Sequence, residues 1–184
     1  TQATLSVGLD SNNRRFSFSA SWEDFDNDGD PDLYVANDYG RNNLYRNDRS
    51  KDGDHTFVDV AKEAGVEDIS AGMSVSWGDF NLDGHMDLYV SNMWSSAGNR
   101  VTYQREFQTD ASELALAEMR RHARGNSLFV NSGDGTFKDA SEEQRVTMGR
   151  WAWGSRFVDL NSDGWDDLLV TNGFITQPDD TGDL

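Results

Sequence analysis

Acidic side chains recur at fixed spacing in three short stretches of the sequence, which begin at Asp24, Asp79 and Asp159. Each stretch has Asp at positions 1, 5 and 9, Asp or Asn at position 3, and Gly at position 6. Carboxylates so close together repel one another unless a cation lies among them. Oxygen ligands of this number and charge suit Ca²⁺ better than Mg²⁺, which prefers a compact octahedron with several water molecules. The spacing therefore predicts three Ca²⁺-binding loops.

The predicted ligands occupy the same positions in each loop. Side chains bind from positions 1, 3, 5 and 9, and position 7 offers a backbone carbonyl. The predicted ligand residues are Asp24, Asp26, Asp28, Asp30 and Asp32 in the first loop; Asp79, Asn81, Asp83, His85 and Asp87 in the second; and Asp159, Asn161, Asp163, Trp165 and Asp167 in the third. Because Asn replaces one carboxylate in the second and third loops, we expect the first loop to bind Ca²⁺ most tightly.

EF-hand and dockerin-like loops are the main competing interpretations, and position 12 separates them from these loops. Both need an acidic side chain there, and an EF-hand also needs a helix on each side. Position 12 is Val35, Val90 or Val170, each in a stretch typical of a strand. The remaining alternative is a set of acidic hairpin turns without metal. Three copies with the same flanking residues favour metal sites over that alternative.

The residues around each acidic loop predict two strands joined by the loop. Before the first loop, apolar residues and serines alternate over 16–22, which is the period of a half-buried strand. After it comes the apolar run 33–35, and the other loops have equivalent flanks. A second repeated motif, at 42–66 and 125–141, is typical of a hairpin with its turn at 132–135. We interpret the equivalent aromatic residues Trp22, Trp77 and Phe157 as core.

Two hairpins in succession make a four-stranded sheet, and sheets in tandem indicate an all-β fold of β-propeller-type blades. The repeat order predicts about two and a half such units with one helical insertion. The predicted boundaries are 1–15 for the end of a preceding unit, 16–70 for the first unit, 71–148 for the second with its insertion at 93–124, and 149–184 for a partial third.

The insertion interrupts the β pattern with a helix predicted over 110–124. Asp110 suits the N-cap, and Gly125 suits the C-terminal stop. The aromatic residues of the insertion have two interpretations. They form a binding platform for sugar or protein, or they pack the helix onto the sheet, and we favour packing. They are Trp94, Tyr103 and Phe107. Three arginines lie near the C-terminal end of this helix, where positive charge suits the helix dipole. The alternative is that they pair with the acidic surface of a neighbouring subunit. They are Arg120, Arg121 and Arg124.

The charge balance excludes several kinds of partner. The 184 residues include 16 Lys and Arg against 33 Asp and Glu, a net charge of −17. Nucleic acids and anionic membrane surfaces require basic patches instead. The absence of cysteine excludes disulfides, thiolate catalysis and zinc–cysteine sites. No apolar run approaches the roughly 18 residues of a membrane-spanning helix, and the start at Thr1 indicates a processed or excised segment.

The acidic-loop hairpin resembles the FG-GAP/VCBS repeat, the calcium-loop unit of integrin α-subunit propellers. The second motif, NNLYRND at 42–48 with HTFVDVAKEAGV at 55–66, resembles the variant in bacterial secreted proteins and in the cartilage acidic protein family. The resemblance implies a β-propeller with Ca²⁺ in loops at the blade rim and ligand binding elsewhere on the propeller face. Such propellers usually have about seven blades. An open array here implies either a longer chain or self-association through open sheet edges.

No catalytic set stands out in the sequence. The histidines are His55, His85 and His122, and each is better explained as a surface residue than as a general base. We expect His85 to lie inside the second loop with its ring solvated. The sequence lacks a nucleophile elbow, a phosphate loop and an H-E-x-x-H motif. We therefore predict a non-enzyme with no cofactor besides Ca²⁺.

The predicted function is an extracellular Ca²⁺-binding repeat module for adhesion, recognition or assembly. Weak extracellular sites fill at roughly 10⁻⁴–10⁻³ M Ca²⁺, which favours a secreted, cell-surface or periplasmic protein. Expected partners are a protein or a glycan, with self-association as a further route. Two alternatives stay open: an accessory domain of a secreted hydrolase acting on polysaccharide or phosphoester, and a calcium-dependent fibre-forming subunit.

Overall fold

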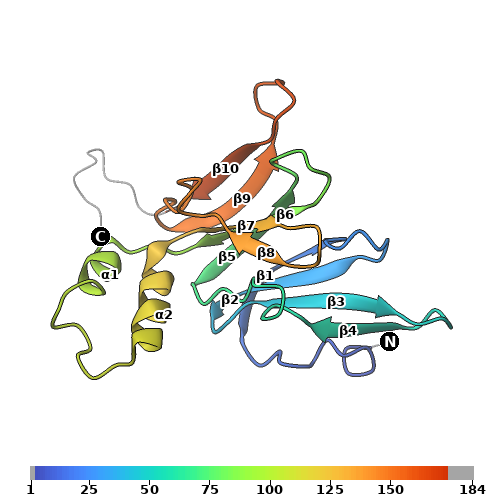
Figure 1. Cartoon of the computed structure of the whole chain (residues 1–184), viewed down its shortest axis with the longest axis horizontal. Helices are drawn as coiled ribbons and strands as arrows, with labels where there is room; N and C mark the ends of the chain where they lie inside the picture. The colour runs from blue at the N-terminus through green and yellow to red at the C-terminus, as the bar shows by residue number, and fades with distance from the viewer. Residues whose placement is uncertain (1–2, 174–184) are drawn as a thin grey trace.

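The structure is a computed structural model and describes residues 3–173 (Figure 1). The first sheet contains β1 (Phe16–Glu23), β2 (Asp32–Tyr39), β3 (Asn43–Arg49) and β4 (His55–Asp59). The second contains β5 (Gly72–Gly78), β6 (Asp87–Asn92), β7 (Ser127–Asn131) and β8 (Phe137–Asp139). A third, two-stranded sheet contains β9 (Ala152–Val158) and β10 (Asp167–Asn172). The predicted all-β fold of tandem sheets is confirmed, and the array is not closed.

Each sheet is an antiparallel meander, in which successive strands of the chain are hydrogen-bonded neighbours. The acidic loops join β1 to β2, β5 to β6 and β9 to β10. Position 9 of the first two loops begins the second strand and pairs with the end of the first, as Asp32 does with Glu23 and Asp87 with Gly78. The predicted hairpins are therefore confirmed. Of the predicted units, residues 1–2 and 174–184 lie outside the described residues.

The three sheets lie side by side, and their first strands contact one another, with β5 touching both β1 and β9 (Figure 1). Two serine hydroxyls of β5 hold β9 in place. Ser74 Oγ accepts a hydrogen bond from the Ser155 amide at 3.1 Å, and Ser76 Oγ accepts one from the Phe157 amide at 3.2 Å. These polar contacts align the strands from which the acidic loops extend.

The largest hydrophobic core lies between the first and second sheets. Trp77 of β5 packs edge-on against Tyr34 of β2, with ring centroids 6.2 Å apart, and it also contacts Phe137 of β8 at 6.3 Å. Phe25, the second residue of the first acidic loop, packs on Phe137 at 5.8 Å. Because Phe25 is buried in this core, its neighbours in the loop are held close to the second sheet.

The same aromatic contact recurs between the second and third sheets, where Tyr89 of β6 packs edge-on against Phe157 of β9. Trp22 occupies the equivalent position in β1, but it is 53% exposed and contacts Phe57 of its own sheet. The interpretation of Trp22 as core was therefore wrong. Its apolar face has no preceding sheet to pack against in the described part of the chain, whereas Trp77 and Phe157 each have one.

This difference predicts unequal costs for the same substitution at two equivalent positions. We expect Trp77→Ala to lower the free energy of unfolding by about 2–3 kcal/mol, because it opens a cavity between two sheets. Trp22→Ala should cost about 1 kcal/mol or less, because the ring is already mostly in water. Urea denaturation of both variants measures the two values. Equal costs would contradict the packing described here.

The insertion contains two helices, α1 (Ser96–Val101) and α2 (Glu113–Arg124). The predicted cap at Asp110 was wrong: Ser112 is the N-cap, and its hydroxyl accepts a hydrogen bond from the Ala115 amide at 3.2 Å. Both residue types cap well, so local sequence did not decide between them. The predicted end at Gly125 is confirmed, with a φ of 105°. Neither helix is long and apolar enough to cross a membrane, nor is any other helix in residues 3–173.

Two arginines of α2 form a partly buried ion cluster within this chain. The Arg121 Nε lies 3.1 Å from Asp68, whose side chain is completely buried in the connection between the first two sheets. Arg121 also pairs with Asp139 of β8 at 2.9 Å, and Arg124 pairs with the same carboxylate at 3.0 Å. These arginines are therefore more than helix-end charges. They fasten the insertion to the second sheet and to the connection between the first two sheets.

Candidate metal centres

All three acidic loops have the same backbone conformation, set by their first carboxylate. Asp24 accepts hydrogen bonds from the amides of Asp28 at 3.1 Å and Gly29 at 2.9 Å. The corresponding bonds to Asp79 are 3.0 and 2.9 Å, and those to Asp159 are 3.1 and 2.9 Å. Positions 4 and 6 have positive φ in every loop; they are Asn27, Leu82 and Ser162, and Gly29, Gly84 and Gly164. Each loop is therefore curled around the carboxylate at position 1.

The carboxylate at position 9 connects the loop to the sheet. Asp32 is only 1% exposed and accepts hydrogen bonds from the amides of Asn47 at 2.8 Å and Phe25 at 3.2 Å. In the second loop, Asp87 accepts one from the Asn131 amide at 2.8 Å. Because Asn47 and Asn131 lie in the third strand of each sheet, this residue ties the loop to a strand beyond its own hairpin.

The side chain at position 3 distinguishes the first loop from the others. In the second loop, the Asn81 amide nitrogen donates to Asp83 at 2.9 Å, so a neutral donor faces the neighbouring carboxylate. Asn161 does the same for Asp163 at 2.9 Å. Asp26 has no hydrogen to donate, and its buried Oδ1 has no hydrogen-bond partner. The first loop therefore has a carboxyl group where the other two loops have an amide donor.

This arrangement fits an oxygen-coordinated cation in the first loop. Asp24, Asp26 and Asp28 each place one carboxylate oxygen within 4.8 Å of the other two. Within residues 3–173, these are the acidic side chains that come together as a group of three. Asp26, one of the three, also has a buried Oδ1 without a hydrogen-bond partner. In the second loop, Oδ2 of Asp87 is likewise buried without a partner. Three clustered carboxylates and no nitrogen or sulfur donor match the ligand preference of Ca²⁺.

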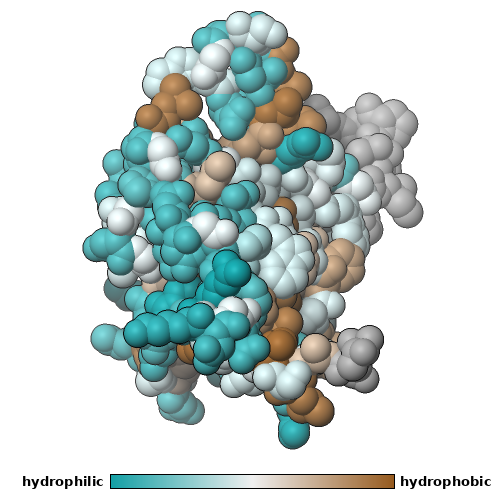
Figure 2. Space-filling view, turned by 90° about the vertical axis from the view of Figure 1, so that its right-hand side faces the viewer, coloured by the Kyte–Doolittle hydropathy of each residue, from teal (hydrophilic) through white to brown (hydrophobic). Residues whose placement is uncertain are grey.

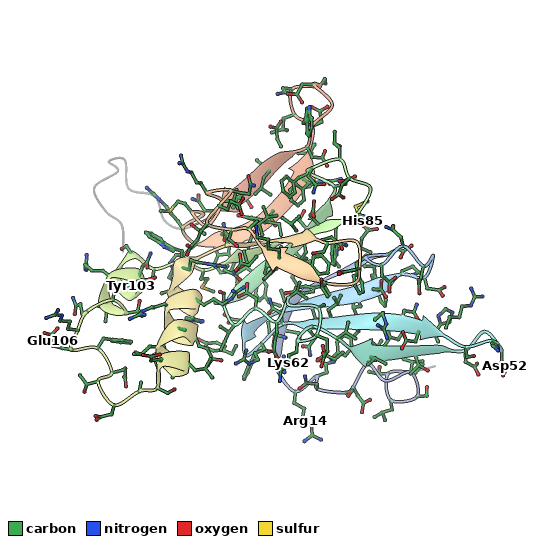
Figure 3. The ribbon with its side chains drawn as sticks, viewed as in Figure 1. Arg14, Asp52, Lys62, His85, Tyr103 and Glu106 are labelled. Carbon is green, nitrogen blue, oxygen red and sulfur yellow. The ribbon has the colours of Figure 1, made fainter. Side chains whose placement is uncertain are left out.

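The residues at position 7 have contacts of different kinds. Their backbone amides donate hydrogen bonds to the carboxylate at position 5. The bond lengths are 2.8 Å for the Asp30 amide, 2.9 Å for the His85 amide and 2.9 Å for the Trp165 amide. The His85 ring is half-buried, and its Nδ1 lies 3.0 Å from the Asn27 side-chain nitrogen of the first loop. The expectation of a solvated His85 ring was therefore wrong. The first and second loops lie side by side, with this ring between them (Figure 3).

Asparagines of the third strands brace the loops, and the sequence analysis missed them. The Asn47 side chain donates to the Pro31 carbonyl at 3.0 Å. The Asn131 side chain donates to Met86 at 3.1 Å and also crosses to the Phe25 carbonyl of the first loop at 2.8 Å. The available signal was their equivalent place at the end of the second repeated motif. Asn131 thus fixes the spacing between two loops.

The buried carboxylates resist ionisation while no cation compensates them. Burial, with a contribution from the adjacent Asp28, raises the pKa of Asp26 above its ordinary value. Burial raises the pKa of Asp32 to about 7 and that of Asp87 to about 6. The side of the molecule seen in Figure 2 is dominated by hydrophilic residues, so a cation reaching this side meets few apolar groups.

These pKa values predict a pH dependence of the Tm that is present without Ca²⁺ and absent with it. A carboxyl whose folded pKa is raised stabilises the fold below its unfolded pKa, and this contribution is lost as the pH rises through the folded pKa. In EDTA we therefore expect the Tm to fall by roughly 5 °C between about pH 5 and pH 8. Saturating Ca²⁺ should remove the fall, because it binds the ionised form. Scanning calorimetry measures the Tm against pH in EDTA and in Ca²⁺. Asp32→Asn should reduce the dependence of the Tm on pH in EDTA. An unchanged dependence in this variant would refute its assignment to Asp32.

Comparison with known proteins identifies the repeat. The FG-GAP-like repeat profile matches residues 24–90 and 112–170, which together make up more than half of the chain. The chain belongs to the FG-GAP-like repeat family. Each matched region of this FG-GAP-like chain ends inside the strand that follows an acidic loop, β6 in the first and β10 in the second.

Two curated relatives match a shorter part of this FG-GAP-like chain. Cartilage acidic protein 1 of Xenopus tropicalis is 40% identical over 62 residues, which is 33% of this chain and 9% of the relative. Cartilage acidic protein 1 of Homo sapiens is 42% identical over 62 residues, with the same coverage of 33% and 9%. The matched segment thus spans less than a tenth of the length of these relatives.

Proposed function

We propose that this chain is a non-enzymatic, calcium-binding repeat module in which Ca²⁺ holds the hairpin turns of adjacent blades. The observation that carries the proposal is the first loop. Three of its carboxylates lie together, and the buried Oδ1 of Asp26 has no partner within the protein. A cation there would neutralise charges that otherwise oppose folding.

Each predicted ligand residue would supply one kind of oxygen to the ion. In the first loop, Asp24, Asp26, Asp28 and Asp32 would supply side-chain oxygens, and the Asp30 carbonyl would supply a fifth ligand. The equivalent residues would serve in the other two loops. Asp24 already orders the turn through its amide contacts, and Asp32 already reaches β3 through the Asn47 amide. Ca²⁺ supplies positive charge that makes these ionised carboxylates compatible with one another.

We infer an extracellular role in adhesion, recognition or assembly, which the family and the net charge of −17 support. Sites with one Asn in place of Asp are weaker and fill only where Ca²⁺ is near millimolar, as it is outside cells. The FG-GAP-like match and the likeness to cartilage acidic protein 1 support this setting. A protein or glycan partner would bind a framework that Ca²⁺ has made rigid, within repeat units near 16–70, 71–148 and 149–184.

Thermal melting in EDTA and in millimolar Ca²⁺, with light scattering on the same samples, tests this function. We expect Ca²⁺ to raise the Tm by about 5–10 °C. Replacing Asp24, Asp26 and Asp28 together by Ala should remove most of that rise, and Mg²⁺ at the same concentration should produce less of it. No response to millimolar Ca²⁺ would show that the loops are acidic turns only.

A second candidate function, assembly of copies of this chain, has a specific observation in its favour. Tyr34 contacts Trp77 between the first two sheets, and Tyr89 contacts Phe157 between the next two. The equivalent residues at the two ends of the described array are exposed, Trp22 by 53% and Leu169 by 43%. A second copy could place its Trp22 against Leu169 in a head-to-tail contact that repeats without closing.

Analytical ultracentrifugation at rising protein concentration tests this assembly. We expect the mean mass to rise with concentration in Ca²⁺, and Leu169→Glu to prevent the rise. A monomer at all concentrations would rule out the contact, while the Ca²⁺ response of the melting temperature would still test the first function separately.

A further inference from the structure

A cavity of about 270 Å³ lies between the ends of the sheets and the helical insertion, and none of the residues that line it is a predicted Ca²⁺ ligand. Asp38 and Tyr39 line it from the end of β2, and Trp94 lines it from the segment after β6. His122 comes from α2, and Trp151 comes from the residue before β9. Residues distant in sequence thus converge on one pocket.

Backbone contacts hold the aromatic walls of this pocket in place. The Trp94 amide donates to the Arg150 carbonyl at 2.9 Å, and the neighbouring Met93 pairs with Trp151 in an isolated antiparallel bridge. Tyr39, which is 66% exposed, packs edge-on against Phe16, with ring centroids 5.8 Å apart. The position of each ring depends on a different sheet. The pocket is therefore a product of the tandem arrangement.

The charge of the pocket comes from one carboxylate. Asp38 is partly buried, and within residues 3–173 its side chain has no hydrogen-bond or ion-pair partner. The lining also contains His122, whose Nδ1 donates a hydrogen bond to the Ile69 carbonyl at 3.0 Å. The whole chain carries a charge of −17, which adds to the negative potential.

The combination of one unpartnered carboxylate and three aromatic side chains matches a particular ligand chemistry. A metal ion would need several oxygen ligands, and a sugar would need several hydrogen-bonding groups around its hydroxyls. An alkylated ammonium group needs only aromatic faces and one negative charge, because its charge is attracted to both. The volume accommodates a small ligand of this kind.

We infer that this pocket binds a small, free organic cation with an alkylated ammonium group, held by Asp38 and by the rings of Tyr39, Trp94 and Trp151. This site is independent of the acidic loops. Its occupant would connect the first, second and third sheets to the insertion. Binding would consequently stabilise the arrangement of the sheets as well as the pocket itself.

Isothermal titration calorimetry of the Ca²⁺-loaded protein with choline chloride tests the inference. We expect saturable binding at one site. The neutral isostere 3,3-dimethylbutan-1-ol should bind at least about tenfold more weakly, because it fills the same space without the charge. Asp38→Asn should weaken choline binding about tenfold or more and leave binding of the neutral isostere unchanged. Trp94→Leu should weaken both ligands.

Asp52→Asn is the matched control, because it removes the same charge at the tip of the β3–β4 hairpin, at the opposite end of the molecule from Tyr103 of the insertion (Figure 3). It should change choline affinity by less than about twofold. Equal binding of choline and its neutral isostere would overturn the inference in favour of an apolar pocket. Binding of a trimethyllysine peptide without binding of choline would overturn the assignment to a free small molecule, and an unchanged affinity of Asp38→Asn would overturn the site. Melting curves of each variant establish that it folds.

Discussion

Replacing Arg121 by Met is expected to lower the free energy of unfolding by about 3–5 kcal/mol. Burial alone would raise the pKa of Asp68, but Arg121 and the surrounding hydrogen-bond donors outweigh burial and hold it below its ordinary value. Asp68 is therefore ionised within the fold. Removing the guanidinium leaves that charge buried beside an apolar side chain, while methionine keeps much of the arginine's volume.

Two further variants separate this effect from a general loss of helix α2. Arg120→Met removes a neighbouring arginine that lies over the Tyr103 ring at 4.8 Å, and we expect it to cost about 1 kcal/mol or less. Combining Arg121→Met with Asp68→Asn should recover part of the loss, because no buried charge then remains. Urea denaturation gives all three values. A cost below about 1 kcal/mol for Arg121→Met would mean that the ion pair does not hold the insertion in place.

Converting Asp26 to Asn should make the first loop behave like the second. We expect the affinity of the first loop for Ca²⁺ to fall about tenfold or more, because one ligand charge is lost. The metal-free protein should become more stable by about 1 kcal/mol. The new amide can donate to Asp28 as Asn81 does to Asp83 at 2.9 Å, and the unpartnered buried oxygen loses its charge.

The reciprocal variant Asn81→Asp provides the matched control. It should tighten Ca²⁺ binding at the second loop and destabilise the metal-free protein. Both effects are opposite to those expected of Asp26→Asn at the equivalent position of the first loop. Calcium titration and melting in EDTA measure both quantities. Variants that shift affinity and metal-free stability in the same direction would contradict the role given to position 3.

The strands and their turns were predictable because they depend on residues close in the sequence. Alternation over 16–22 and the glycine-containing loop after it specify β1 and its turn without reference to anything distant. Short-range signals were also ambiguous in places: Asp110 and Ser112 are both good caps, and the six residues of α1 carry too little pattern to be recognised. The exposure of Trp22 depends on which sheets neighbour it, and identical repeat positions do not encode that.

The clustering of acidic side chains in the first loop was predictable from the sequence, but the residues that brace the loops were not. Spacing alone indicated that Asp24, Asp26 and Asp28 would lie together, and they do. The bond from Asn131 to the Phe25 carbonyl joins residues 106 positions apart, and the ion pair of Arg121 with Asp68 spans 53. Such contacts arise from the packing of one sheet on the next. They are therefore not visible in any single repeat.

Titration of Ca²⁺ into the metal-stripped protein, monitored by isothermal titration calorimetry, tests the central claim most directly. The account predicts saturable binding at all three loops, with the tightest site lost when Asp24, Asp26 and Asp28 are replaced by Ala and the two weaker sites retained. Saturable binding that is unaffected by this triple replacement, or no binding at millimolar Ca²⁺, would contradict it.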